Sequence, residues 1–159
     1  MKQSTEPKLG DNPRRGKNRA VDGDPRIGDR LPDGTIYAGI SPDTNKPMHT
    51  TPADASLKMT FNAAQKYAKR LGTLFHKTGA FSHKDWRVPT KAELNVLFNN
   101  RAAVGGFDVS GSLAAGLYWS SSHADHGTVW SQRFSDGFQV GIDGPRLSVR
   151  LVRSEGAKP

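Results

Sequence analysis

The sequence predicts an α+β domain in which two helices pack on a small twisted antiparallel sheet, with many loops. The first indication is composition: of 159 residues only 35% are hydrophobic, while glycine (17) and proline (10) are frequent, as in loop-rich folds with short strands. The second is a pair of segments with helical periodicity in the middle of the chain. The third is a series of short strand-like segments after Tyr118, separated by turn residues.

Residues 1–30 are predicted to form a basic flexible arm, followed by a domain over 31–156 and a short tail at 157–159. The arm contains three prolines, several glycines and few apolar side chains, so it cannot bury enough surface to offset the entropy of folding. Two interpretations stay open: a disordered leader, or a segment that docks on a partner.

The formal net charge of +8 at pH 7 favours an anionic partner. Basic residues cluster in the arm and aspartates follow them closely: Arg14, Arg15, Lys17 and Arg19, then Asp22, Asp24 and Asp29. No recognised nucleic-acid-binding module accompanies this charge. We therefore expect partner chains or an anionic surface at the arm, and not a nucleic acid.

The N-terminus runs from Met1 into polar residues without an apolar core segment, so no Sec signal peptide is predicted. No apolar run approaches the length that spans a bilayer. We expect a protein that is made in the cytoplasm and either stays there, is exported by a route other than Sec, or is incorporated into a particle.

The first strand is expected at 35–40, because Asp33-Gly34 is a turn signal and the six residues after it have strand composition. The following segment, 41–55, is predicted to be a loop. It carries three prolines among polar residues: Pro42, Pro47 and Pro52.

The first helix is expected from Phe61 to Leu71, with Thr60 as its N-cap and Gly72 at its end. Its apolar residues recur at helical spacing along one stripe: Phe61, Ala64, Tyr67, Ala68 and Leu71.

The second helix begins with a capping box. The Thr90 hydroxyl can accept a hydrogen bond from the Glu93 amide, while the Glu93 carboxylate reaches back to the Thr90 amide. Pro89 forces an extended entry, and an apolar stripe follows at Leu94, Leu97 and Phe98. We therefore assign Glu93 a structural role and not that of a general base.

The C-terminal third is predicted to contain short antiparallel strands. They are expected at 128–135, 138–142 and 146–153, with turns at Ser135-Asp136-Gly137 and Asp143-Gly144-Pro145. In the last of them Leu147, Val149 and Leu151 share one face, and this strand is expected to close the sheet.

Few residues indicate catalysis. His123, Asp125 and His126 are potential metal ligands within one loop, but nothing elsewhere completes a zinc set. Ser120, Ser121 and Ser122 lack a nucleophile elbow or an oriented base, and there is no cysteine. We predict no enzyme activity, no metal and no cofactor.

Several separated blocks resemble one known family: Asp85-Trp86-Arg87-Val88-Pro89-Thr90-Lys91-Ala92-Glu93-Leu94, Tyr118-Trp119-Ser120, Trp130, Phe134-Ser135-Asp136-Gly137 and Arg146 to Arg153. They are similar to the DUF1566 family, also called the Legionella collagen-like protein C-terminal domain. That family is a branch of the C-type-lectin-like fold, related to formylglycine-generating enzymes and to the variable proteins of diversity-generating retroelements. The resemblance implies that the first strand pairs with the last. It does not bring calcium-mediated sugar binding, because the lectin motifs for that are absent.

The resemblance also marks structural positions: Trp86, Arg87, Pro89, Thr90, Glu93, Trp119, Phe134, Asp136, Gly137, Arg150 and Arg153. The aromatic residues among them are expected in the core. The arginines are expected to bind Asp85, Asp136 or a C-terminal carbonyl.

In the retroelement-diversified relatives, ligand-facing residues lie between the Tyr-Trp-Ser block and the final strand. The resemblance thereby nominates a binding surface: His123, Asp125, His126, Trp130, Gln132, Phe138, Gln139 and Asp143. An ordinary exposed loop is the alternative interpretation of these residues.

The function expected from this resemblance is non-catalytic recognition of a protein or glycan, as in an adhesin, an effector module or a phage receptor-binding protein. The alternative is a structural component of a virion or injection apparatus that is anchored by its arm and forms a homo-oligomer.

Overall fold

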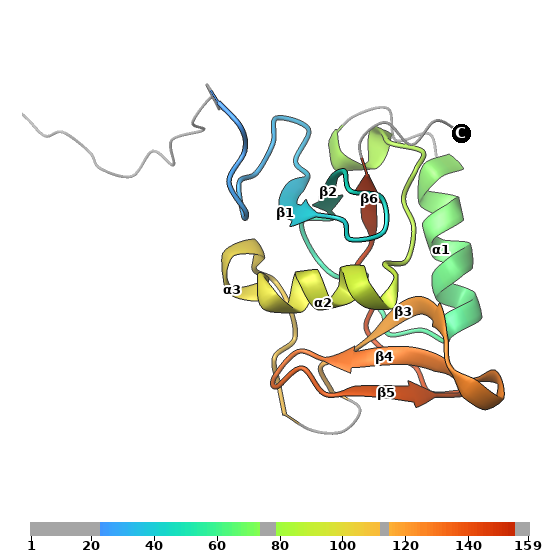
Figure 1. Cartoon of the computed structure of the whole chain (residues 1–159). Coiled ribbons are helices and arrows are strands. Elements are labelled where there is room, and N and C mark those ends of the chain that lie inside the picture. Colours follow the sequence, from blue (N-terminus) through green and yellow to red (C-terminus); the bar gives the residue numbers. More distant parts are fainter. Residues whose placement is uncertain (1–22, 74–78, 112–114, 155–159) are drawn as a thin grey trace, which may run out of the picture.

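The structure is a computed structural model that describes residues 23–73, 79–111 and 115–154. It confirms the α+β class: a few helices pack with antiparallel strands (Figure 1). The strands form two three-stranded sheets and not the single sheet that the sequence predicted. Residues 1–22 of the predicted arm and the tail at 157–159 lie outside the described residues.

The first sheet has the order β1-β2-β6, where β1 is Ile36–Ile40, β2 is Pro47–Thr50 and β6 is Val152–Ser154. Two predictions were wrong here. The segment 41–55 was expected to be a loop, yet it contains β2, whose proline is the first residue of the strand, where Pro is tolerated. The first strand was expected to pair with the last, but β2 lies between them and bonds to both.

The second sheet has the order β3-β4-β5, formed by β3 (Leu117–His123), β4 (Val129–Arg133) and β5 (Gln139–Ile142). The predicted hairpin between β4 and β5 is confirmed, and Gly137 supplies the positive φ of 83° that its turn needs. The expected last strand is only partly a strand: β6 begins at Val152, and Leu147 and Ser148 make isolated bridges instead.

The first helix, α1, covers Phe61–Thr73 and is two residues longer than the stripe predicted. Gly72 was expected to end the helix but lies inside its last turn. A Cβ at this position would come within 2.6 Å of the Lys84 carbonyl oxygen, so the glycine allows close packing and does not terminate the helix. The second helix, α2, covers Lys91–Asn99, and its capping box is confirmed. A short α3 (Arg101–Val104) and two 3-10 turns, η1 (Gly79–Ser82) and η2 (Asp125–Gly127), complete the helices of the described residues.

Two hydrophobic clusters hold these elements together. In Figure 1, α2 lies between the two sheets. It packs Leu94 and Leu97 against both of them, with Met48 from the first sheet and Phe134 beside the second. The other cluster joins α1 to the opposite face of the second sheet. The segment 147–152 contributes to both clusters and is buried along its whole length.

The residues marked as structural are mostly where we expected them. Trp86, Trp119 and Phe134 are buried at 4%, 1% and 0% exposure. Arg153 donates to Asp85 as predicted, at 2.9 Å. The expected partner Asp136 was wrong, because it bonds its near neighbour Arg133 in the hairpin turn. Arg87 instead pairs with Glu93, and Arg150 pairs with Asp54.

The packed part of the chain begins before the predicted boundary at Leu31. The Gly28 amide donates to the Tyr37 carbonyl at 2.8 Å, and the Tyr37 amide donates to the Asp29 carbonyl at 3.0 Å. Arg30 and Ile36 form an antiparallel bridge. A truncation that begins at Leu31 would therefore remove part of the domain.

Candidate ligand-binding groove

A groove of about 410 Å³ opens between the N-terminus of α1 and one end of the second sheet. Its volume lies in the range of small-ligand sites, roughly 300–1,000 Å³. Residues from four separate segments line it: Thr60, Phe61, Asn62, Trp119, His123, Gly127, Val129, Ile142, Asp143 and Gly144. Two of the nominated residues, His123 and Asp143, are thereby brought together from positions far apart in the chain.

Aromatic rings form the apolar part of the groove. The Phe61 ring lies 5.7 Å from the His123 ring in an edge-on arrangement and 5.8 Å from the Trp119 ring in a tilted one. Both separations are typical of favourable aromatic pairs. Trp119 is buried and fixed, since its Nε1 donates to the Met59 carbonyl at 2.8 Å. Phe61 is only half-buried, so part of its ring can contact a ligand.

Polar side chains from three parts of the chain line the same groove. His123 ends β3, Asn62 lies in the first turn of α1, and Asp143 follows β5; all three are exposed. Thr60 is held as the helix cap by the Ala63 amide at 3.4 Å. An imidazole, a carboxamide and a carboxylate offer both donors and acceptors. The groove can therefore hydrogen-bond a ligand while an apolar face of that ligand lies on the ring.

The N-terminus of α2 fixes β3, the strand that carries His123. The Ser121 amide donates to the Pro89 carbonyl at 2.7 Å, and the Ser122 hydroxyl accepts from the Lys91 amide at 2.9 Å. Ser121 and Ser122, which the sequence did not support as nucleophiles, thus bond to the segment at the start of α2. Since β3 also pairs with β4, the groove is built on a strand held from both sides, which favours a preformed site.

Glu93 anchors this helix terminus. Burial by itself would raise the pKa of the Glu93 carboxyl, but hydrogen bonds from Arg87, Ser41 and the Thr90 amide outweigh it and lower that pKa below its ordinary value. The Glu93 side chain has no exposed surface, and the Ser41 hydroxyl donates to Oε1 at 2.6 Å. Glu93 is thereby an ionised structural group, as the capping box predicted.

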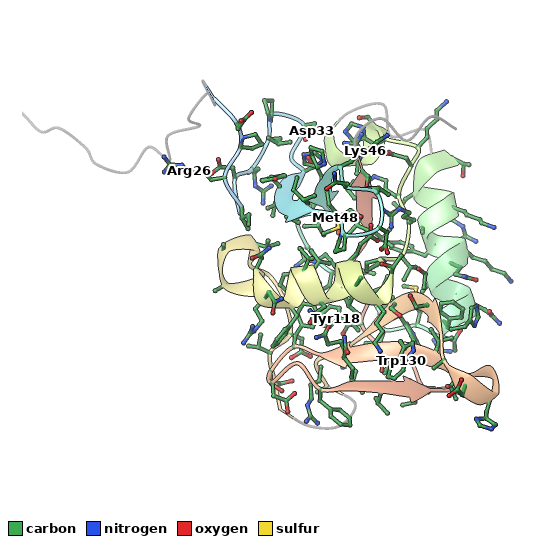
Figure 2. All side chains as sticks on the ribbon, in the orientation of Figure 1. Arg26, Asp33, Lys46, Met48, Tyr118 and Trp130 are labelled. Atoms are coloured by element: carbon green, nitrogen blue, oxygen red, sulfur yellow. The ribbon has the colours of Figure 1, made fainter. Side chains whose placement is uncertain are left out.

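The other nominated residues lie elsewhere. Asp125 and His126 are exposed in η2, beside the groove but not lining it. Trp130 is on the opposite face of the second sheet, toward α2 (Figure 2), and the register of β4 with β5 places Gln139 on the same face. Phe138 is 46% exposed, with the Arg133 guanidinium 5.1 Å from its ring.

Two nominated residues on the α2-facing side, Trp130 and Gln132, contact side chains of α2. The Lys91 ammonium lies 3.3 Å from the centre of the Trp130 ring, so one face of this ring is already covered. Gln132 is only 2% exposed and donates to Asn95 Oδ1 at 2.9 Å. Its side chain is therefore inside the fold and not on a binding surface.

Sequence reasoning missed most of the groove. Phe61 was assigned to the buried stripe of α1, and Asn62 was not nominated. The sequence around these two residues does not indicate that they will lie near the end of β5. Two glycines also contribute, Gly127 and Gly144. Both glycines directly follow a nominated residue, His126 and Asp143, so their proximity to the nominated surface could have been inferred.

A second groove of about 390 Å³ lies along α1, between Lys69 and the segment 86–88. Across the described ranges, no three His, Asp or Glu side chains gather as a metal site would require. None of the helices in those ranges combines the length and apolar character needed to cross a membrane.

Comparison with known families gives one clear match. The family model described as the Lcl C-terminal domain matches residues 42–153. This region includes β2, both long helices, the second sheet and all ten residues that line the groove. No curated protein matches the chain.

Proposed function

The chain belongs to the Lcl C-terminal domain family, and we propose that it is a non-catalytic recognition module whose ligand binds in the groove beside α1. The observation that carries this proposal is the convergence of His123, Asn62 and Asp143 around the half-buried Phe61 ring. Polar groups of this kind fix the orientation of a ligand, and the ring supplies contact area.

We propose a glycan as the ligand class. A sugar ring presents an apolar face of C–H groups together with hydroxyls around its rim. The groove offers the matching surface, since an aromatic ring lies next to a carboxylate and a carboxamide. A protein loop could use the same groups. Parallel screens against glycans and against proteins distinguish these two ligand classes.

The test begins with the full chain on a glycan array and in a pull-down from candidate host extracts, followed by calorimetric titration of each ligand found. Asp143→Ala should weaken glycan binding about tenfold or more, because a hydrogen bond to a charged group is lost. Asp125→Ala is the matched control: it removes the same charge from the neighbouring η2 and should change affinity less than twofold.

His123→Ala and His126→Asn form a second matched pair. His126 has a positive φ of 57°, and asparagine accepts that conformation with little strain. Only the His123 change should weaken binding. Equal losses from both members of a pair would place the ligand on the exposed loop and contradict the groove. Recovery of the glycan unaltered by mass spectrometry after long incubation would support a non-catalytic role, and cleavage products would contradict it.

A further inference from the structure

The outer edge of β5 differs from the other three sheet edges. The edge of β1 is covered by Arg30, which bridges to Ile36, and the edge of β6 by Arg87, which bridges to Val152. The edge of β3 is covered by Ser148, whose backbone bonds to Leu117 and Trp119. Within the described residues, no segment makes backbone hydrogen bonds to the outer side of β5.

The orientation of the free groups follows from the pairing with β4. The Phe138 carbonyl accepts from the Arg133 amide, and the Val140 carbonyl accepts from the Ser131 hydroxyl, so both point toward β4. Since successive residues alternate in an antiparallel ladder, the N–H and C=O groups of Gln139 and Gly141 point outward. They form a template for one more strand.

Apart from the shortness of the strand, this edge lacks the usual protection against pairing. Its four residues contain no lysine and no proline, and its register with β4 is regular, whereas both β1–β2 and β3–β4 contain irregularities. In Figure 1, β5 runs along the outer margin of the described fold. Natural edge strands are commonly blocked by charge, proline or a bulge, and β5 has none of these.

Side chains along β5 favour a second copy of this chain as the added strand. By alternation, Phe138, Val140 and Ile142 share one face, and Phe138 is 46% exposed while the other two are half-buried. An antiparallel copy centred on Val140 would place Val140 opposite itself and Phe138 opposite Ile142. Aromatic and β-branched pairs of this kind stabilise antiparallel sheets.

The hydrogen-bonding groups match in the same register. Gln139 of one copy lies opposite Gly141 of the other, so their outward N–H and C=O groups bond reciprocally at both ends of the pair. No charged side chain faces its own copy in this arrangement. We propose that two copies of the chain associate through β5, antiparallel and centred on Val140, to form one continuous sheet about a two-fold axis.

The first test measures self-association of the full chain by sedimentation equilibrium over a wide concentration range. The unaltered chain should dimerise, and Gln139→Pro should weaken dimerisation about tenfold or more. Proline removes an outward N–H without removing a bond to β4, and symmetry makes the loss count twice. Gln139→Ala keeps the N–H and is the matched control, with an expected change of less than twofold.

The second test reads the register directly. The chain has no cysteine, so Val140→Cys introduces its sole thiol at the proposed two-fold axis, where opposed Cα atoms lie roughly 4.5 Å apart and a disulfide can form. Mild oxidation should give a covalent dimer. Ile142→Cys is the control, because its copies would be offset by four residues, roughly 13 Å, and should not cross-link.

A chain that stays monomeric at all concentrations, or a dimer that Gln139→Pro leaves unchanged, would overturn the proposal. Equal cross-linking of the two cysteine variants would overturn the register. Circular dichroism of each variant before the assay confirms that it is folded. Glycan binding by the groove is measured separately, so failure of one proposal does not imply failure of the other.

Discussion

Arg150 and Asp54 form an ion pair across 96 positions of sequence, with the Arg150 Nε donating to Asp54 Oδ1 at 2.8 Å. The Arg150 side chain has no exposed surface. Its other nitrogens donate to the Thr51 and Gly105 carbonyls at 2.7 and 2.9 Å, and the Tyr118 hydroxyl donates to Asp54 Oδ2. One guanidinium thereby fastens two loops to the core.

Replacing Arg150 should therefore be among the most destabilising single changes in the chain. We expect Arg150→Met to lower the free energy of unfolding by about 3–5 kcal/mol, because it leaves two carbonyls without this donor and the Asp54 carboxylate without its counter-charge. Urea denaturation measures this. Arg133→Ala, which breaks the solvent-exposed pair with Asp136, is the control and should leave the midpoint nearly unchanged. If the two variants lost the same unfolding free energy, burial of the Arg150 ion pair would not account for its contribution to stability.

The lowered pKa of the Glu93 carboxyl should make the free energy of unfolding depend on pH. The folded pKa of its carboxyl lies below the unfolded value, so its contribution to stability is fully present above the unfolded pKa, about 4.3. The contribution is lost as the pH falls through the folded pKa.

The measurement compares the chain with Glu93→Gln in urea at pH 7, 5, 4 and 3. The difference in unfolding free energy should be largest at pH 7 and 5 and should shrink between pH 4 and 3. Because other carboxylates titrate in both proteins, the subtraction isolates Glu93. A difference that stays constant with pH would show that the loss of packing, and not of charge, accounts for the effect.

Gly137 should not tolerate any side chain. Its φ is +83°, and a Cβ would lie 2.7 Å from the Phe98 ring, whose neighbour Phe134 is fully buried. We expect Gly137→Ala to destabilise the domain by roughly 1–3 kcal/mol. Gly127 also has a positive φ but open space around it, so Gly127→Ala separates backbone strain from the clash. Calorimetric melting of both variants should show the larger shift for Gly137→Ala.

Replacing Trp130 tests whether the ligand binds in the groove or on the α2-facing side of the second sheet. Its ring faces α2 and carries the Lys91 ammonium, whereas the groove opens on the other face of the sheet. Trp130→Ala should therefore change ligand affinity by less than twofold while lowering thermal stability modestly. Lys91→Met should not alter affinity either. A large loss of affinity from Trp130→Ala would move the ligand site to the α2-facing side.

The features predicted well from the sequence depend on neighbouring residues. The capping box of Thr90 and Glu93 needs only residues within one turn, and the hairpin at Gly137 needs one positive φ. In contrast, β2 was missed because Pro47 indicates a loop locally, while the burial of Met48 depends on sheet partners from both ends of the chain.

The groove, too, could be predicted from the sequence only in part. His123 and Asp143 were nominated and do meet, but Phe61 joins them from the start of a distant helix. Period-2 alternation could separate Trp130 from Val129, yet it could not show which face would meet α1. That choice is made by packing between elements, and local sequence patterns do not encode it.

The segment 147–152 has a consequence for biosynthesis. It runs from the second sheet to β6 in the first sheet (Figure 1) and supplies side chains to both hydrophobic clusters. A nascent chain that has not yet emerged as far as Val152 can form α1 and the β4–β5 hairpin but can close neither cluster. Folding must then wait for contacts such as that between Thr50 and Leu151, 101 positions apart. Such non-local closure is slow, so the translating chain would expose apolar surface to chaperones until this late segment arrives.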